Sequence, residues 1–420
     1  MFKRRSSTPA PTAPASVAPP AAEIDLDRKV LVSRQPVLDT MGRVTGYRIA
    51  YALPDGAGSA DDQAMSLFDT VLSDFGLEHL VGDTMAHLTI SREMLLTLGT
   101  PPIRPDRLVL RIPYEAAVDE TVTPTLDEAI ERGYTLELDG IPAAGFELAV
   151  LERFGLVELD LNSWSPTDAA ALVKQIAARH SRPLAAGVQT YDERDAAQEL
   201  GFELFTGPFF GTPQIIPGRK VPTGAIQTLA ALVELQSEDT SLEHAVAVID
   251  RDLGLSVKLL RYINSAYFGM AAKVNSIRDA AIRLGTRGVA RWALTVTITG
   301  APDISPELAV LALTRARLCE TLGADVAGVD GAELFTIGLL SATDAVFRRP
   351  LATIIPELPL SERVTNAILN HAGPAGEVLR AALAYERGEF GNSMLEQLGR
   401  GHGRSYRTAL GWAQETLAAA

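Results

Sequence analysis

The sequence holds a single cysteine, Cys319, among its 420 residues. One thiol excludes an internal disulfide framework, and such scarcity is typical of a reducing compartment, so we expect a cytoplasmic protein. Long apolar runs are also absent, because no stretch reaches the roughly 18 residues that a membrane-spanning helix needs. The basic start MFKRRSS is followed by a Pro/Ala/Thr-rich tract, which does not resemble the apolar core of a secretory signal.

Histidine is scarce as well. The six histidines lie far apart in the sequence, without an HxxxH pair and without a Cys/His cluster. The ligand spacing of a zinc-type site is therefore missing, and we expect neither a metal nor another cofactor.

Positive charge is scarce in the first half of the chain. Residues 1–214 hold 18 Lys and Arg against 31 Asp and Glu, whereas residues 215–420 hold 20 against 21. Binding along a phosphate backbone requires a basic surface. We therefore expect no nucleic-acid partner.

The order of local patterns indicates two folded regions. Residues 1–25 are mostly Pro, Ala, Ser and Thr, which predicts a disordered tail. Within 28–210, short apolar runs alternate with helical segments, which predicts parallel βα units, and about seven or eight strands favour a (β/α)8-type barrel. A Pro/Gly-rich linker is expected at 211–222, and an all-helical region at 223–415.

The best-defined helical pattern lies between residues 248 and 285. Leu255, Leu259 and Ile263 recur every four residues and share one helical face, so Ile263 is expected in the core. Ser276 is a candidate N-cap for a second helix, in which Leu284 is expected to be buried. Gly285 is expected to end that helix, and Thr286 to begin another.

Several residues of this region recur at fixed offsets. They are Asp250, the KLL of 258–260, the INSAYFG of 263–269, Ser276-Ile277, Ala280-Ala281 and Leu284-Gly285. This run resembles the HDOD domain, an all-helical regulatory relative of the HD phosphohydrolases. The resemblance implies turns at Phe268-Gly269, and we expect Asn264 and Ser265 to cap or brace the loop that follows the helix.

HD phosphohydrolases bind metal through a His-Asp pair, and this sequence departs from that pattern. The matching segment is GLLSATDAVF, in which Ser341 and Ala342 occupy the positions of the pair. Asp344 follows without histidine partners, so we expect it to be a helix cap or a surface acid. His371 is a lone histidine, and we expect it in the core or in a loop.

The first region carries a second resemblance. SRQPVLDTMGRVTGYRIAYA looks like the opening of an EAL domain, the barrel that hydrolyses cyclic di-GMP, and LELDGIP, LVELDLN, AAGVQT and FTGPFFGTP match later strand motifs of that family in order. Together, the two resemblances point to the two-domain EAL–HDOD signalling proteins of bacteria. They imply a degenerate EAL-type barrel followed by an HDOD bundle.

An EAL phosphodiesterase holds two divalent metals with carboxylates at the ends of its strands. The resemblance places Arg48, Arg111 and Ala186 where that family has glutamates, and Thr89 where it has asparagine. The other matched positions of this degenerate site are Asp139, Gly140, Glu158, Asp160 and Thr206. Two arginines at former carboxylate positions oppose metal binding.

The two acids kept at matching positions, Asp139 and Asp160, have two interpretations. We expect them to pair with Arg48 or Arg111 in the mouth of the barrel. The alternative is a phosphate-accepting pocket formed by the two arginines.

The sequence therefore predicts a non-catalytic signalling or scaffold protein that is related to cyclic di-GMP signalling and acts through protein contacts with an unidentified signalling protein. One alternative is a cyclic di-GMP receptor without hydrolysis, and another is a weak cyclic di-GMP phosphodiesterase. Arg261, Arg287 and Arg291 are the candidates for contact with an acidic partner. A solvated helical face is the competing interpretation of these three residues.

Overall fold

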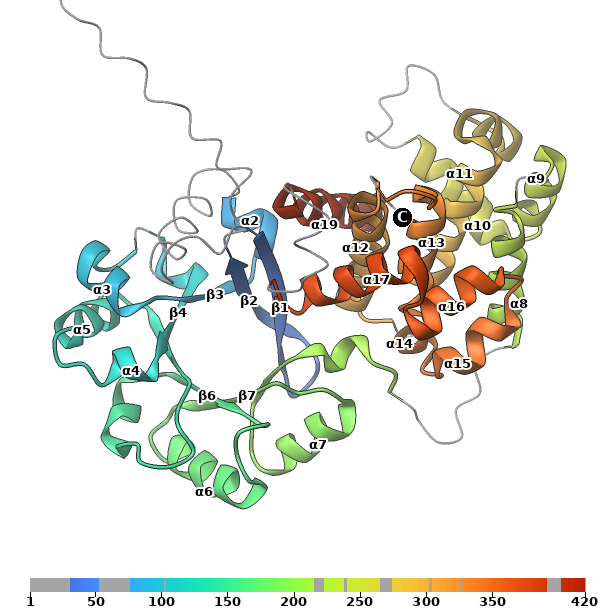
Figure 1. Cartoon of the computed structure of the whole chain (residues 1–420). Helices are drawn as coiled ribbons and strands as arrows, with labels where there is room; N and C mark the ends of the chain where they lie inside the picture. Colours follow the sequence, from blue (N-terminus) through green and yellow to red (C-terminus); the bar gives the residue numbers. More distant parts are fainter. Residues whose placement is uncertain are drawn as a thin grey trace, which may run out of the picture.

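A computed structural model of the chain describes residues 31–52, 76–101, 103–214, 223–237, 240–264, 274–301, 304–324, 326–390 and 402–419. The predicted tail at 1–25, most of the predicted linker at 211–222, Ser265 and the predicted turn at Phe268-Gly269 lie outside these residues. Figure 1 shows the barrel, blue to green, beside a helical half, yellow to red.

The first half is a closed eight-stranded barrel with the strands in sequence order. Its strands are β1 (Leu31–Asp39), β2 (Val44–Ala52), β3 (Met85–Thr89), β4 (Leu108–Pro113), β5 (Thr135–Asp139), β6 (Leu156–Asp160), β7 (Arg182–Ala186) and β8 (Leu204–Thr206). The barrel and the neighbouring helical bundle confirm the predicted fold class.

The prediction of parallel strands holds from β2 to β8 but is wrong for β1, which runs antiparallel to both of its neighbours. The reason is a tight hairpin between β1 and β2. The Asp39 carboxylate accepts hydrogen bonds from the backbone N–H groups of Met41 and Arg43, each at 2.9 Å. Gly42 has a φ of 75°, a conformation that glycine adopts without a steric penalty.

Short helices surround the barrel: α2 (Gly76–Val81), α3 (Arg92–Leu98), α4 (Tyr114–Ala117), α5 (Thr123–Glu131), α6 (Pro166–Ala177) and α7 (Tyr191–Glu199). α6 illustrates why they form. The Ser165 hydroxyl accepts a hydrogen bond from the Asp168 N–H and caps the first turn. Leu172, Val173 and Ile176 then form a buried stripe against the barrel.

The barrel interior is apolar at one level. A separate cluster of buried residues fills it: Val37, Val109, Leu156, Leu184, Ala186 and Leu204. Because successive side chains of a strand point to opposite faces, the residues two positions further along β4 and β6 also face inward. Those positions are Arg111 and Glu158, so the polar residues of the barrel begin one level above the apolar plug.

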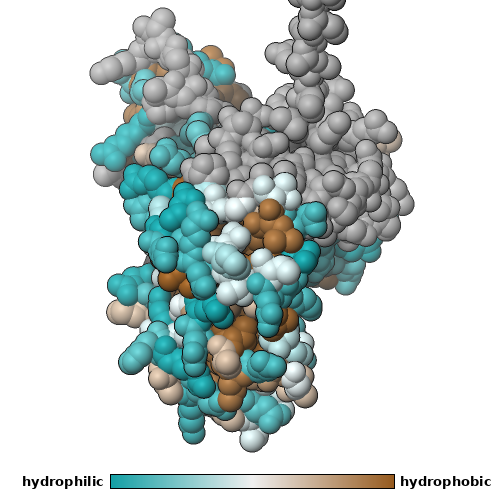
Figure 2. Space-filling view, turned by 90° about the vertical axis from the view of Figure 1, so that its left-hand side faces the viewer, coloured by the Kyte–Doolittle hydropathy of each residue, from teal (hydrophilic) through white to brown (hydrophobic). Residues whose placement is uncertain are grey.

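The outer face of the barrel is mainly hydrophilic. Figure 2 shows this face, on which hydrophobic residues form separate patches. Leu96, Val118, Ile130 and Leu148 are among the exposed hydrophobic residues, with exposed fractions of 36–47%. Scattered exposure of this kind is normal for a folded protein and does not indicate an interface.

The second half consists of helices packed on one another. They are α8 (Thr223–Glu234), α9 (Leu242–Asp250), α10 (Leu253–Ile263), α11 (Ile277–Thr299), α12 (Pro306–Leu322), α13 (Gly331–Leu340), α14 (Thr343–Phe347), α15 (Leu351–Ile354), α16 (Glu362–Asn370), α17 (Gly373–Glu386) and α19 (His402–Ala419). Leu255, Leu259 and Ile263 are buried as predicted. Cys319 is a free, buried thiol in α12.

The predicted caps and breaks are confirmed around α10 and α11. Ser276 caps α11 by accepting a hydrogen bond from the Asp279 N–H at 3.0 Å. α11 is interrupted at Gly285, which has a φ of 73°, so two helical segments meet there. Asn264 braces the intervening loop through hydrogen bonds with the backbone of Val274 at 2.8 Å. Leu284 is only half-buried, although the sequence predicted a core residue.

The two halves share a buried interface, which the sequence did not predict. β1 packs against α17 and α19, and one continuous hydrophobic cluster includes Leu31 of the barrel and Tyr385 of α17. The Tyr385 hydroxyl accepts a hydrogen bond from the Val32 N–H at 3.2 Å. The expected boundaries at 28–210 and 223–415 stay a prediction, but the contacts join these two regions.

Charged residues reinforce the interface. Arg34 of β1 lies 3.4 Å from the Glu307 carboxylate of α12, and the exposed fractions of these side chains are 4% and 12%. The Tyr47 hydroxyl donates a hydrogen bond to the same carboxylate at 2.6 Å. Among the residues that the structure describes, no helix is both long and apolar enough to cross a bilayer.

Candidate functional site

Arg111 lies at the centre of a network of charged side chains inside the barrel. Its guanidinium is 3.0 Å from Glu137, 2.7 Å from Asp139 and 3.1 Å from Glu158. It also donates a hydrogen bond to the Thr89 hydroxyl at 2.8 Å. Strand register explains the cluster, because Thr89 and Glu137 are the register partners of Arg111 on the two flanking strands.

Two further bonds extend the network. Arg48 of β2 lies 3.2 Å from the second oxygen of Glu158. His87 of β3, the register partner of Arg48, lies 2.5 Å from Glu137 through Nδ1. Each of the two buried glutamates therefore contacts two basic side chains.

Burial and neighbouring charge compete at each group. Burial lowers the pKa of Arg111, but the carboxylates of Glu158, Glu137 and Asp139 outweigh it and raise that pKa above its usual value. Burial raises the pKa of Glu137, yet His87, Arg111 and Arg48 bring it well below the usual range. For Glu158, burial prevails over the attraction of Arg48 and Arg111, and its pKa is raised.

The structure brings together five of the residues that the sequence selected: Arg48, Thr89, Arg111, Asp139 and Glu158. The expected pairing of Asp139 with an arginine is confirmed. The expectation for Asp160 is wrong, because its carboxylate accepts hydrogen bonds from Asn162 at 2.9–3.0 Å and from the Ser163 hydroxyl at 3.2 Å. Asp160 ends β6, where the chain turns, so local donors are closer than the arginines.

The remaining candidates surround this network. Gly140 and Ala186 line a cavity of about 670 Å³ at the barrel mouth, together with Arg48, Asp139, Glu158 and Asp160. Thr206 is fully buried, and its hydroxyl has no hydrogen-bond partner among the described residues. The mouth is therefore open, whereas the charged layer beneath it is filled.

Sequence reasoning missed His87 and Glu137. A signal was present, because Glu137 precedes Asp139 by two residues and His87 precedes Thr89 by two. Residues at this spacing point to the same face of a strand. The inward position of each could therefore have been inferred once Asp139 and Thr89 were placed at the barrel mouth.

The residues of the barrel mouth do not fit the pair of divalent metals that the EAL resemblance implies. Such cations require several free oxygen ligands at once. Here Glu137, Asp139 and Glu158 all lie within 3.1 Å of one guanidinium. Among the described residues, no group of three or more His, Cys, Asp or Glu side chains is arranged to hold a metal ion.

The segment that matches the His-Asp pair of HD phosphohydrolases, with Ser341 and Ala342, contacts Arg315 of α12. The side chains of Arg315 and Glu386 are buried and lie 2.9 Å apart. Arg315 also donates a hydrogen bond to the Ser341 hydroxyl at 3.2 Å, and Ala342 is buried beside it. The Ser341 side chain therefore has a structural role, because it accepts a hydrogen bond from a buried arginine.

Two nearby predictions have different outcomes. The expectation that Asp344 is a cap or a surface acid is wrong, because the N-cap of α14 is Ala342 and Asp344 lines an internal cavity. Burial raises the pKa of Asp344 to about 6. His371 follows α16 with a φ of 51°, which confirms its expected loop position.

The three arginines proposed for partner contact differ in their surroundings. Arg291 forms two bonds with Glu320 at 2.6 and 2.7 Å and lies 3.6 Å over the Phe335 ring, so it has a structural role that the sequence did not reveal. Arg287 lies 3.9 Å from Asp330. Both line a groove of about 660 Å³. Arg261 is exposed on α10.

Comparisons with known proteins agree with this division of the chain. The model of the HDOD domain family matches residues 222–397. The chain is 26% identical over 411 residues to the uncharacterised protein YuxH of Bacillus subtilis, covering 93% of this chain and 99% of YuxH. It is also 26% identical over 382 residues to the cyclic di-GMP phosphodiesterase CdgJ of Vibrio cholerae, covering 86% and 85% of the two chains.

Two of the solved structures that resemble this chain each match about half of it. BlrP1 of Klebsiella pneumoniae, in complex with calcium and cyclic di-GMP, is 18% identical with a TM-score of 0.36, and the match covers 44% of this chain and 56% of BlrP1. The YkuI protein of Bacillus subtilis, which has an EAL domain, is 16% identical with a TM-score of 0.38, covering 54% and 70%. The helical half is the part that resembles the HDOD domain family, whose model matches residues 222–397.

Proposed function

We propose that this chain is a non-catalytic protein of cyclic di-GMP signalling that acts through protein–protein contacts, with the barrel as its scaffold. The observation that carries the proposal is the position of Arg111, which contacts Glu137, Asp139 and Glu158 at once. The relation to CdgJ, a cyclic di-GMP phosphodiesterase, supports the signalling context.

The charged layer gives the physical reason against hydrolysis. Phosphodiester hydrolysis by a two-metal site needs cations that activate water and neutralise the developing phosphoryl charge. A guanidinium already occupies the oxygens of these carboxylates that would bind a metal and, unlike a bound metal, cannot lower the pKa of a coordinated water. Arg48, at 3.2 Å from Glu158, adds a second fixed positive charge. Metal entry would require both arginines to leave buried ion pairs, which is costly.

A cyclic di-GMP receptor without hydrolysis is the first alternative. The open cavity of about 670 Å³ and the partly exposed Arg48 at its wall favour it. The charge balance opposes it, because Asp139, Glu158 and Asp160 line the same cavity and would repel two phosphate groups. A weak phosphodiesterase is the second alternative, and the similarity to CdgJ, a cyclic di-GMP phosphodiesterase, favours it.

Incubation of the purified chain with cyclic di-GMP and either Mg²⁺ or Mn²⁺ tests the proposal. We expect no linear product by anion-exchange chromatography. Calorimetric titration with cyclic di-GMP, with and without Mg²⁺, separates the receptor from the scaffold. Turnover that persists through further purification and disappears in Asp139→Asn would contradict the proposal, as would a titration that saturates.

The partner surface is proposed to lie on the helical half, at Arg261 and Arg287. Arg261 is exposed, and the Arg287 side chain is 46% exposed on a neighbouring helix. The double variant R261E/R287E should lose the partner that the wild-type chain captures, while the matched barrel variant R182E should keep it. If R261E/R287E keeps the partner and deletion of the barrel loses it, the interaction belongs to the barrel.

A further inference from the structure

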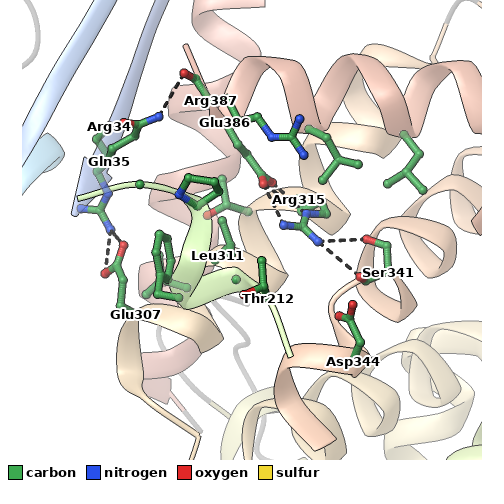
Figure 3. Close-up of a pocket in the computed structure, with 18 of the residues that line it drawn as sticks. Arg34, Gln35, Thr212, Glu307, Leu311, Arg315, Ser341, Asp344, Glu386 and Arg387 are labelled. Carbon is green, nitrogen blue, oxygen red and sulfur yellow. Dashed lines mark hydrogen bonds and ion pairs between the residues drawn. The ribbon is translucent and has the colours of Figure 1, made fainter. Parts of the chain in front are cut away.

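A cavity of about 240 Å³ lies between the barrel and the helical half. Gln35 of β1 and the segment 207–213, which follows β8, form the barrel side. Helices α12, α17 and α19 supply most of the opposite side. Figure 3 shows how Thr212, which follows β8, Leu311 and Arg315 of α12, and Asp344 of α14 lie around this space. The cavity therefore exists only where the two halves meet.

Most of the wall is apolar. Leu311 of α12, Leu379 and Leu383 of α17, and Phe210 of the barrel line it. A volume of 240 Å³ is slightly below the usual range for drug-sized ligands, which begins at about 300 Å³. A ligand here would be compact and would bury an apolar body against these side chains.

The arginines of the cavity already have carboxylate partners. Arg34 lies 3.4 Å from Glu307, and Arg315 lies 2.9 Å from Glu386. Arg387, which is half-exposed, lies 3.9 Å from Glu389. The first two pairs contribute no net charge to the cavity, whereas Glu389 is not part of its lining and Arg387 adds a positive charge at its edge.

Asp344 is the acid left over from this pairing. One carboxylate oxygen accepts a hydrogen bond from the Ala345 N–H at 2.7 Å, and no ion pair of this residue occurs among the described residues. Arg315 is the cation that acts on it electrostatically, but its guanidinium bonds Glu386 and Ser341. Asp344 is thus the lining acid whose negative charge, when it is ionised, no ion pair among the described residues compensates.

Thr314 provides a second, independent polar group. It lines the same cavity from α12, and its side chain is buried with an exposed fraction of 2%. Its hydroxyl has no hydrogen-bond partner within the described part of the chain. Buried hydroxyl groups are rarely left without a partner, so this one indicates a position for a ligand atom.

We propose that this interdomain cavity binds a small organic cation, an ammonium or amidinium group on a compact apolar body, which pairs with Asp344. The apolar body contacts Leu311 and Leu379, and the Thr314 hydroxyl accepts a further N–H of the ligand. An anion would be repelled by Asp344, and the guanidinium that acts on Asp344, that of Arg315, already bonds Glu386 and Ser341. A neutral ligand would leave the carboxylate uncompensated. This site goes beyond the signalling role proposed above and does not depend on it.

Benzamidine is a suitable probe, and benzamide is its neutral counterpart of nearly the same shape. Titration calorimetry on the full chain at pH 8 should show saturable 1:1 binding of benzamidine, at least about tenfold tighter than benzamide, since an ion-paired hydrogen bond is worth roughly 1.5 kcal/mol or more. Absence of saturation by benzamidine, or equal affinity for both probes, would overturn the proposal.

The pH dependence gives a second readout. With the pKa of Asp344 at about 6, roughly a tenth of this group is ionised at pH 5, so benzamidine should bind about tenfold more weakly there. The other titratable or charged groups that line the cavity are Arg34, Glu307, Arg315, His371, Glu386, Arg387 and Tyr406. Burial, Arg380 and Arg387 lower the pKa of His371, and its protonation at low pH would also weaken the binding of a cation.

Two variants separate these contributions. Asp344→Asn removes the charge and keeps the shape, so it should abolish both the preference for benzamidine over benzamide and the larger part of the pH dependence. Leu311→Phe narrows the cavity and should weaken both probes. The matched control is Asp195→Asn, an exposed acid on α7 that should change neither. An Asp344→Asn protein that is folded by circular dichroism and still prefers benzamidine would overturn the proposal.

Discussion

Two buried arginines organise the two halves of this molecule differently. Arg111 of the barrel contacts three carboxylates, and the other nearby basic groups, Arg48 and His87, bond the same acids. Arg315 of the helical half contacts one carboxylate, Glu386, and uses its remaining nitrogen for Ser341. The first arrangement satisfies every buried acid of its layer. The second leaves Asp344 without an ion pair.

The comparison shows that a buried arginine can pair with all the nearby acids in one site and leave an acid without an ion pair in another. In the barrel, parallel strands in register place acids on both sides of one guanidinium. In the bundle, helices cross at an angle, and the carboxylates of Glu386 and Asp344 approach from separate elements. A filled site is stable and unreactive, whereas an incomplete one favours a ligand.

The largest effect is expected from Arg111→Met. It leaves Glu137 and Glu158 buried with less compensation, and breaking a buried pair in this way destabilises by about 3–5 kcal/mol. Urea denaturation followed by circular dichroism measures the change. Arg182→Met removes an ion pair in which both side chains are about half-exposed, and it should cost about 1 kcal/mol or less. Equal effects of the two variants would mean that the barrel network is not a stabilising unit.

Arg315→Met should come second, at about 3 kcal/mol, because it leaves the single carboxylate of Glu386 buried without its partner. The same denaturation experiment applies. The double variant R315M/E386L should recover part of the loss, since removal of both charges avoids an uncompensated one. A double variant that is less stable than R315M would contradict this account.

Arg291→Glu is expected to destabilise by about 2 kcal/mol, because it replaces a paired guanidinium with an acid next to Glu320 and removes the contact with Phe335. Arg261→Glu, on the exposed face of α10, should change stability by about 0.5 kcal/mol or less. Thermal denaturation distinguishes them. If the two variants melt together, Arg291 is as available for a partner as the sequence suggested.

Asp344→Asn should increase stability at neutral pH by about 1–2 kcal/mol, because it removes a half-buried carboxylate that lacks an ion pair among the described residues. The folded-state pKa of about 6 is above the usual aspartate value of 3.8, so the folded protein binds the proton more tightly than the unfolded chain. The associated stability is present below about pH 4 and is lost as the pH rises through 6. Melting curves of both proteins between pH 4 and 8 should converge at the acidic end. Parallel curves would show that Asp344 is not buried as described.

Local patterns in the sequence were sufficient for much of the fold. The alternation of short strands and helices predicted the barrel, and the four-residue spacing of Leu255, Leu259 and Ile263 predicted the buried face of α10. Ser276 caps a helix and Gly285 adopts a positive φ. Both roles depend only on neighbouring residues in the sequence, so both could be predicted from it. The expected pairing of Asp139 followed from the position of the strand ends in a barrel.

The tertiary structure decided which charged groups meet. Arg34 and Glu307 are 273 residues apart in sequence, and Arg315 and Glu386 are 71 apart, so no local spacing connects them. The sequence determined that Asp160 and Asp344 are acids near the ends of elements, but their partners depended on strand register and helix packing. Asp160 found donors in its own turn, while Asp344 lies among helices and a barrel segment and forms no ion pair with the described residues. Burial depends on how the chain packs. Asp160 is exposed, whereas Asp344 is half-buried in the wall of the interdomain cavity, so only Asp344 is a candidate for ligand binding there.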